Sequence, residues 1–195
     1  MTDSVYQRVL GSDIERLRPE LRTYFAEGAR VGLGSGVFEV AGSTRTVLRP
    51  VLAFLGWRRV LFADYGRDVP FDIVNTPTPD GALDAVRTFH FPGRDRPLED
   101  TMRVVDDELH DYLGRRRGLE VQLALTITDG RLSMRSSRLW LHLGGARIRL
   151  PRIATVTVDE SWSDGKQRVD VRLRSPILGE WFRYAGSFNY RYEEQ

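Results

Sequence analysis

The sequence predicts a mainly β fold (α+β): an antiparallel β-barrel or strongly curled sheet, with two helices in its N-terminal half. From about residue 69 to residue 191, apolar and polar residues alternate with a period close to two. Aspartate-glycine pairs, which supply the positive φ angles of tight hairpin turns, lie between the alternating runs at residues 80–81, 129–130 and 164–165. Eight or more strands joined by such turns cannot stay flat, because sheets twist and their edges need protection.

Two apolar stripes of helical period predict helices over residues 13–25 and 44–55, as a plug or lid for the sheet. Pro19 and Pro50 fall inside these stripes, so each helix starts late or bends there. The second stripe would also suit a membrane surface. Its few charges make packing against the sheet the better explanation.

The strands follow in order along the chain. We expect them over residues 29–41, 69–78, 82–91, 119–128, 131–143, 153–162, 166–175 and 180–191. Residues 98–105 read as a further strand, and residues 106–113 as either a strand or one helical turn. No linker or repeat interrupts the pattern, which predicts one domain over residues 1–195. A barrel of this many strands is wide enough to hold a small ligand.

The amino-acid composition excludes several classes of protein and of functional site. No run of about twenty apolar residues predicts a transmembrane segment, and the first residues lack a secretion signal, so we expect a cytoplasmic protein. The absence of cysteine rules out disulfides, thiolate zinc sites and a cysteine nucleophile. All but one of the 29 basic residues are arginines, but acids are interspersed with them and the net charge is only +2. We therefore expect no nucleic-acid partner.

No motif predicts a cofactor or a metal. Glycines at residues 32, 34 and 36 are not spaced as in a dinucleotide-binding loop, and they lie within strand-like sequence. They favour a bent or crowded strand with a close backbone approach. The histidines, His90, His110 and His142, show no metal-ligand spacing.

One face of the strand over residues 131–143 begins apolar and turns polar. Its members are Leu132, Met134, Ser136, Arg138, Trp140 and His142. This gradient is typical of a cavity mouth, where a few polar groups orient an apolar ligand. Emergence of the strand end into solvent explains the gradient equally well.

Glu160 shares a strand face with apolar residues, among them Val158 and Trp162. A carboxylate in such surroundings has a raised pKa and can act as a general acid or base. The competing explanation, which we prefer at this point, is that Glu160 is solvated beside the turn at residues 164–165.

Aromatic side chains alternate along the final strand, over residues 180–191. Phe182, Tyr184, Phe188 and Tyr190 share one face, and Trp181 lies on the other. An aromatic wall can hold a polyene, sterol or polyketide-like ligand, and a tyrosine hydroxyl can orient it. Ordinary core packing is the commoner use of such a stripe.

Several short motifs, weak one by one, occur in a distinctive order. They are Tyr6-Gln-Arg-Val-Leu-Gly11 with Leu17, Pro19, Leu21 and Arg22, the glycine strand at 32–36 and the helix ending Leu55-Gly56, Asp68-Val-Pro-Phe71, Val86-Arg-Thr-Phe89, Gly144 to Pro151, and Pro176-Ile-Leu-Gly179-x-Trp181-Phe182-x-Tyr184-x-Gly186. This order resembles the bacterial domain-of-unknown-function family 4166. The resemblance implies a shared fold, with members that stand alone or are fused to saccharopine-dehydrogenase-like reductases. It implies no activity and no catalytic residues.

The function predicted first is binding of a hydrophobic small molecule. The finer expectation within it is a cofactor-free cyclase or isomerase acting on a polyketide- or lipid-like intermediate in bacterial natural-product biosynthesis. The alternatives are a non-enzymatic carrier of lipids or other hydrophobic ligands, and an interaction domain that partners a reductase. The candidate catalytic residues are Glu160, His142 and Tyr184. The candidate substrate-binding residues are Met134, Arg138, Trp140, Trp162, Phe182 and Phe188.

Overall fold

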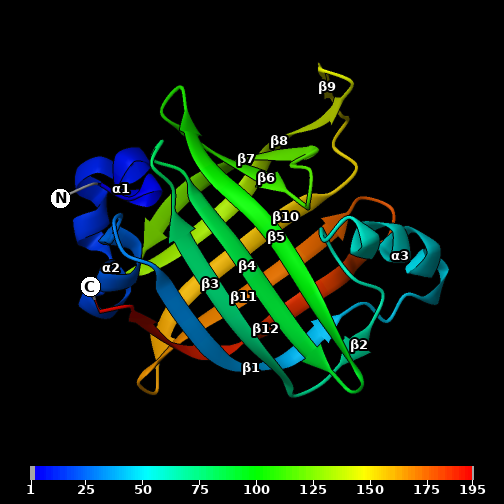
Figure 1. Ribbon diagram of the computed structural model, residues 1–195, viewed down its shortest axis with the longest axis horizontal. Coiled ribbons are helices and arrows are strands. Elements are labelled where there is room, and N and C mark those ends of the chain that lie inside the picture. The colour runs from blue at the N-terminus through cyan, green and yellow to red at the C-terminus, as the bar shows by residue number, and fades with distance from the viewer. Residues whose placement is uncertain (1–2, 195) are drawn as a thin grey trace.

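The computed structural model describes residues 3–194 as a closed antiparallel barrel of ten strands (Figure 1). Around the ring the order is β10-β11-β12-β1-β3-β4-β5-β6-β7-β8, and β8 pairs with β10 to close it. The strands of the ring are β1 (Gly32–Gly42), β3 (Val69–Pro77), β4 (Leu83–Phe91), β5 (Arg94–Val105), β6 (Glu108–Leu113), β7 (Leu119–Thr128), β8 (Arg131–Leu143), β10 (Thr155–Ser163), β11 (Lys166–Ser175) and β12 (Gly179–Tyr192). The predicted fold class is confirmed.

Two short strands lie outside the ring and were not predicted: β2 (Tyr65–Gly66) pairs with β1, and β9 (Ala146–Arg149) pairs with the end of β8. The segment at 106–113 is a strand after a tight turn in which Asp106 and Asp107 both have positive φ. Aspartate tolerates this conformation, so the hairpin forms without the glycine that marks the other turns.

The helices differ in their bounds from the prediction. The described residues form three α-helices: α1 (Val5–Leu10), α2 (Pro19–Ala26) and α3 (Arg49–Trp57). In place of one helix over 44–55, a 3-10 turn at Thr46–Leu48 comes before α3. In place of one helix over 13–25, a 3-10 turn at Gly11–Arg16 ends before Pro19, which occupies the first turn of α2 because its missing N–H costs nothing there. In the described chain no helix has the length and apolar character needed to cross a membrane.

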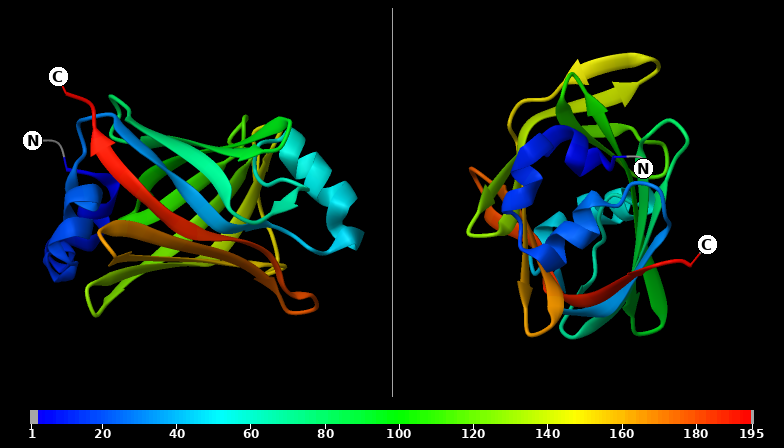
Figure 2. Two further views of the ribbon diagram at one scale, coloured as in Figure 1. Left: turned by 90° about the horizontal axis from the view of Figure 1, so that it is seen from below. Right: turned by 90° about the vertical axis from the view of Figure 1, so that its left-hand side faces the viewer.

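The helices cover the two ends of the barrel (Figure 2). α1 and α2 lie across one end, where their buried side chains Tyr6, Leu21 and Phe25 join one cluster of the hydrophobic core. α3 lies at the opposite end, where Leu52 is buried in the second cluster with the aromatic rings of β1, β3 and β4. The two clusters leave the middle of the barrel between them.

Glycines of β1 allow aromatic side chains of β12 to cross this strand. Gly36 pairs with Phe188, and a Cβ at Gly36 would overlap the Ser187 carbonyl oxygen and the Phe188 side chain. Gly34 likewise faces Tyr190, with Ile73 and the Tyr190 ring at 2.5 and 3.0 Å from where a Cβ would stand. The crowded strand expected from the glycine spacing is therefore what these residues form.

Replacing Gly36 with alanine is expected to lower the free energy of unfolding by about 1–3 kcal/mol, because the new methyl group meets backbone that cannot move away. Urea unfolding measures the change. Gly118→Ala is the control, since a methyl group there meets the movable end of Arg58. Equal stability of the two variants would contradict this account of β1.

Candidate functional site

A largely apolar cavity of about 760 Å³ occupies the inside of the barrel. Its walls include Phe38 and Phe71 from one core cluster and Met102 and Val121 from the other. The volume lies within the range of small-molecule sites, and the predominance of apolar walls is typical of them. The barrel thus encloses more space than its own side chains fill.

The mouth of the cavity lies between α3 and the segment 149–154. Among the residues that line the cavity, Val51 of α3 and Arg152 and Ile153 of this segment are exposed to solvent. The opening arises where ring closure ends, because β10 pairs with β8 only over the register from Leu132 to Arg135. Farther along, β8 pairs with β9 and leaves the barrel wall.

A β-bulge at Ser137 reverses the faces of β8. In the pairing with β7, Ser136 is opposite Leu123 and Arg138 is opposite Gln122, so Ser137 is the extra residue. Leu132 and Met134 face inward before the bulge, whereas Leu139 lines the cavity after it. The single face expected over 131–143 is therefore wrong in its second half.

Trp140 and His142, expected at the cavity mouth, consequently lie on the outer face. Trp140 stacks on His110 with ring centroids 5.7 Å apart, and the Arg147 guanidinium lies over its other side at 4.0 Å. His142 Nε2 lies 2.6 Å from Oε2 of the buried Glu120, whose Oε1 lies 2.6 Å from His110 Nδ1. This cluster holds the β8–β9 hairpin against the barrel wall, away from the cavity.

Arg147 completes the cluster around Glu120. Its Nε donates to Oε2 at 2.9 Å and its Nη2 donates to Oε1 at 2.5 Å. Burial alone would raise the pKa of Glu120, but the hydrogen bonds from Arg147, His142 and His110 outweigh it and lower the pKa. A carboxylate satisfied by several donors is held in one place, which suits a structural role for His142.

The other candidate residues divide into two groups. Those that line the cavity are Glu160, Tyr184, Met134, Phe188 and Arg138. Trp162 and Phe182 are packed in the core and are absent from the lining, with Phe182 against Phe62 at 5.0 Å between centroids. Trp181, expected on the opposite face, does line the cavity, because a bulge in the β11–β12 pairing turns β12 at this residue.

Glu160 is buried rather than solvated, with 7% of its surface exposed. Burial raises its pKa to about 7, although a hydrogen bond from Gln167 Nε2 at 2.6 Å and the charge of Arg87 both lower it. Burial also raises the pKa of Tyr6 and of Tyr24, and the nearby Glu160 carboxylate adds to both shifts. Glu160 therefore lies toward the end covered by α1 and α2, deep below the mouth.

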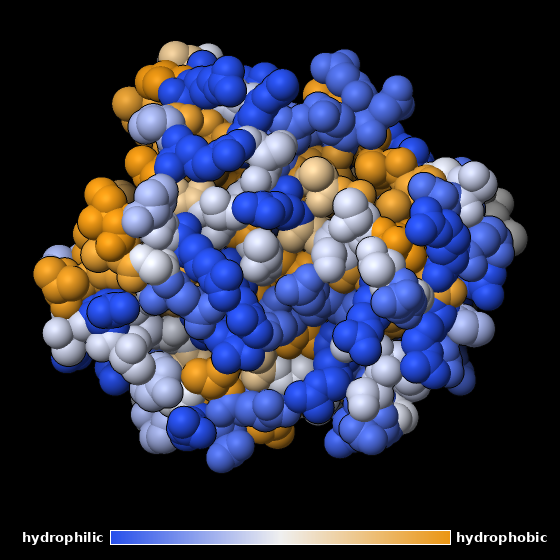
Figure 3. Space-filling model, turned by 180° about the vertical axis from the view of Figure 1, so that it is seen from behind, coloured by the Kyte–Doolittle hydropathy of each residue, from blue (hydrophilic) through white to orange (hydrophobic). Residues whose placement is uncertain are grey.

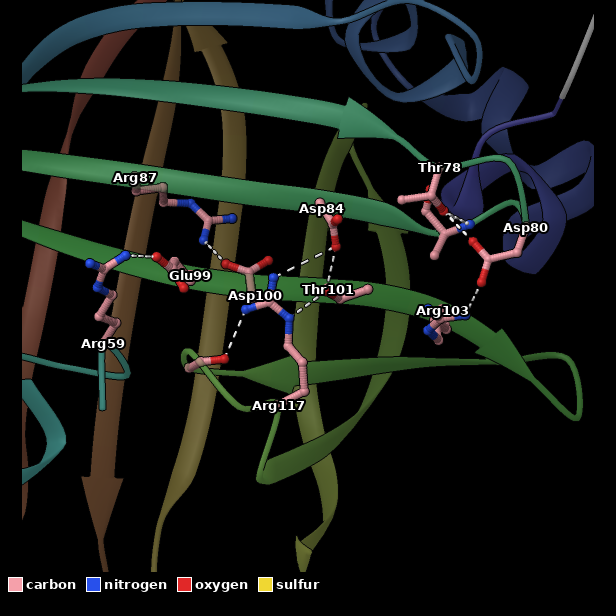
Figure 4. Close-up of polar contacts among 12 residues, drawn as sticks. Arg59, Thr78, Asp80, Asp84, Arg87, Glu99, Asp100, Thr101, Arg103 and Arg117 are labelled. Carbon is pink, nitrogen blue, oxygen red and sulfur yellow. Dashed lines mark hydrogen bonds and ion pairs between the residues drawn. The ribbon is translucent and has the colours of Figure 1, made fainter. Parts of the chain in front are cut away.

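Arg87, Asp100 and Asp111 also line the cavity and were not among the sequence candidates. Arg87 of β4 and Asp100 of β5 reach toward each other from neighbouring strands and form an ion pair (Figure 4). Asp111 of β6 lines the same wall. Burial raises the pKa of Asp111 well above its usual range, and the charge of Asp100 raises it further.

Both aspartates have a buried oxygen that lacks a hydrogen-bond partner among the described residues. Asp100 Oδ2 and Asp111 Oδ1 are buried and accept no hydrogen bond within the described chain. A buried carboxyl oxygen without a hydrogen bond lowers the stability of the fold. Such an oxygen beside a cavity is a position at which a ligand could supply the missing donor. Tyr184 lies close enough to this group to feel its charges. Burial raises the pKa of Tyr184 to about 12; the charge of Arg87 lowers this pKa, and the charges of Asp100, Asp111 and Glu160 raise it.

The sequence does carry a signal for this group. Asp100 lies between Leu98 and Met102 on one strand face, and Arg87 lies between Ala85 and Phe89 on the next. A charge in the middle of an apolar face predicts a buried, partnered group. Within residues 3–194, no three acidic or histidine side chains are arranged to hold a metal ion.

Comparison with known proteins matches the family described as Domain of unknown function (DUF4166) to residues 17–188. The chain belongs to this family. The DUF4166 match covers the barrel from the turn before α2 to most of β12, and with it every ionisable cavity residue named above. A relative in Bacillus subtilis (strain 168), Uncharacterized protein YndH, is 28% identical over 198 residues, covering 95% of this chain and 96% of its own. No solved structure matches the chain.

The pKa of Glu160 makes stability depend on pH. Its value of about 7 is above the ordinary 4.5, so the folded state binds the proton more tightly than the unfolded state. The contribution of Glu160 to folding is therefore most favourable at acidic pH, declines between about 4.5 and 7, and stays unfavourable above that window. Glu160→Gln should raise the free energy of unfolding above pH ~7 by up to about 3 kcal/mol, and by less in acid.

Urea unfolding at a series of pH values measures this difference. Glu194→Gln, at an exposed position near the C-terminus, is the control and should follow the original protein. If Glu160→Gln and the original protein gave parallel curves, burial of an ionisable Glu160 would be refuted.

Proposed function

We propose that this barrel binds a hydrophobic small molecule that carries a hydroxyl or amino group. The observation that supports this most directly is the pairing of an apolar cavity with the unpartnered oxygens of Asp100 and Asp111. A ligand hydroxyl can donate to Asp100, which forms an ion pair with Arg87. It can also accept from Asp111, which burial keeps protonated to a higher pH than usual.

The positions of these groups give the ligand a direction. The mouth between α3 and segment 149–154 has apolar side chains on both sides, whereas Asp100, Asp111 and Glu160 are in the interior. The polar end of the ligand would enter first, and its apolar body would remain along the aromatic and aliphatic walls. Anionic ligand groups are disfavoured in the interior, where the carboxyl groups of Asp100, Asp111 and Glu160 accompany Arg87, which is already paired with Asp100. The other arginines of the lining, Arg138, Arg149 and Arg152, are exposed to solvent.

Binding is measurable with N-phenylnaphthylamine, an apolar amine whose fluorescence rises in an apolar site. We expect saturable binding that is weakened in Val156→Trp, because Val156 lines the cavity and an indole there takes up part of its apolar space. Dodecanol should displace the probe at about tenfold lower concentration than dodecanoate, a difference of about 1.4 kcal/mol. Asp111→Ala should reduce the preference, as it removes one of the polar partners.

Val74→Trp is the matched control, since Val74 is exposed on the outer wall of β3. Equal probe binding by the two tryptophan variants, with both folded, would count against an interior site. A stronger competition by dodecanoate than by dodecanol would refute the assignment of the polar end.

The finer proposal is that the protein is a cofactor-free isomerase or cyclase acting on a polyketide- or lipid-like compound. One observation favours it over carriage alone: Glu160, with a pKa of about 7, lines the cavity together with the Tyr184 hydroxyl. A carboxylate of this pKa can remove a proton from carbon beside a ketone and return it to another carbon. The Tyr184 hydroxyl, which burial keeps protonated, can donate to the oxygen on which negative charge develops.

Exchange of the acidic C–H hydrogens of β-tetralone in deuterated water, followed by NMR, tests this chemistry. We expect catalysed exchange that rises with a midpoint near pH 7 and falls at least tenfold in Glu160→Gln. Tyr184→Phe should reduce the rate while probe binding is retained. Exchange no faster than in buffer, with normal probe binding, would leave the carrier as the better function.

A further inference from the structure

The surface around α3 is apolar and unusually exposed. Val47, Val51, Phe54 and Trp57 keep 75%, 56%, 59% and 62% of their surface accessible, although the apolar stripe was expected to pack on the sheet. Only Leu52 of this helix is fully buried. Figure 3 shows hydrophobic residues gathered along the edge of the molecule at which α3 lies, at the left in this view.

Two neighbouring loops extend the apolar surface. The β11–β12 turn carries Ile177, which is 92% exposed, and it lies beside the segment before α3, because Arg45 Nη2 donates to the Leu178 carbonyl oxygen at 3.4 Å. Across the cavity mouth from α3, Ile153 is 58% exposed. Large exposed apolar side chains in one region mark an interaction surface.

The charges within the segment that contains α3 are all positive, and arginines without ion-pair partners among residues 3–194 surround it. Residues 44–63 contain four arginines and no acidic residue. Six exposed arginines near α3 and the mouth form no ion pair with the described residues: Arg45, Arg49, Arg115, Arg116, Arg149 and Arg152. The turn at 115–116 belongs to this region because Arg115 N donates to the Arg58 carbonyl oxygen, at the end of α3.

We propose that this surface, the α3 face, docks on an anionic lipid bilayer. Tryptophan and phenylalanine side chains insert at the boundary between headgroups and acyl chains, and surrounding arginines bind lipid phosphates. The proposal stands on exposure and charge alone and needs no ligand in the barrel. Its consequence is geometric: the cavity mouth, which Val51 and Ile153 border, would face the membrane.

A bilayer accounts for the combination better than a folded acidic partner does. The apolar side chains stand on α3 and on two separate loops, and the cavity mouth opens between α3 and the loop that carries Ile153. They therefore do not form one continuous surface that a folded partner could match. Insertion into lipid requires no matching shape, only apolar side chains that reach a common plane and cations at its border. Attraction to a bilayer of negative charge also predicts a strong dependence on salt.

Co-sedimentation with vesicles tests the proposal. The protein should bind vesicles of equal parts phosphatidylcholine and phosphatidylglycerol, and bind phosphatidylcholine alone much more weakly. Raised salt should weaken the binding, and Arg49→Gln with Arg152→Gln should weaken it about fivefold for each arginine removed. The fluorescence of Trp57 should shift to shorter wavelength on binding, and Trp57→Phe should abolish that shift.

The matched apolar variants are Phe54→Ser with Trp57→Ser on the α3 face, and Val74→Ser with Val86→Ser on the outer wall of β3 and β4, where these valines pair. Only the first pair should lose vesicle binding. The charge control is Arg131→Gln with Arg135→Gln, exposed on β8 beyond the mouth.

Three results would overturn the proposal. One is an absence of sedimentation with anionic vesicles, and another is equal loss in the test and control variants. The third is a dimer in light scattering that hides Trp57 without lipid, which would assign the α3 face to a second copy of the chain. Each is distinguishable from failure of ligand binding, because probe binding inside the barrel is measured without vesicles.

Discussion

Closure of the sheet by the β8–β10 pairing is the constraint on which both the cavity and its mouth depend. The pairing is short, covering Leu132 to Arg135 on β8 and Thr157 to Glu160 on β10. It brings Glu160 onto the inner wall opposite Leu132. Where it ends, Ser136 Oγ accepts from the Val156 N–H at 2.9 Å, so a side chain completes the contact that the next backbone pair would have made.

The bulge at Ser137 determines where β8 leaves the barrel wall. Beyond the bulge, β8 turns out of the ring and pairs with β9, so the wall is open beside segment 149–154. The outward half of β8 then needs its own support, and Glu120, with its histidine and arginine partners, provides it. The polar residues on this strand are thus explained by the hairpin they hold.

Local patterns in the sequence identified the strands but could not identify the faces throughout. Period-two alternation and the aspartate-glycine turns placed β3, β7, β8, β11 and β12 within a residue or two of their observed bounds. A single inserted residue reverses a face without changing composition. For that reason the alternation grouped Trp140 and His142 with the inward-facing residues of β8, as candidates for a cavity mouth, whereas they lie on the outer face. The Arg87, Asp100 and Asp111 group required knowledge of which strands are neighbours, which alternation alone does not contain.

The charged residues buried in the barrel are only partly neutralised by partners from the chain itself. Arg87 offsets the burial of Asp100, and Gln167 and Arg87 lower the cost of burying Glu160. These contacts still leave one oxygen on each of Asp100 and Asp111 without a donor. An apolar replacement of similar size would remove that cost, since buried ion pairs are often exchangeable for well-packed hydrophobic residues. Retaining unsatisfied carboxyl oxygens beside an apolar cavity is therefore a stability cost that a bound hydroxyl or amine would recover.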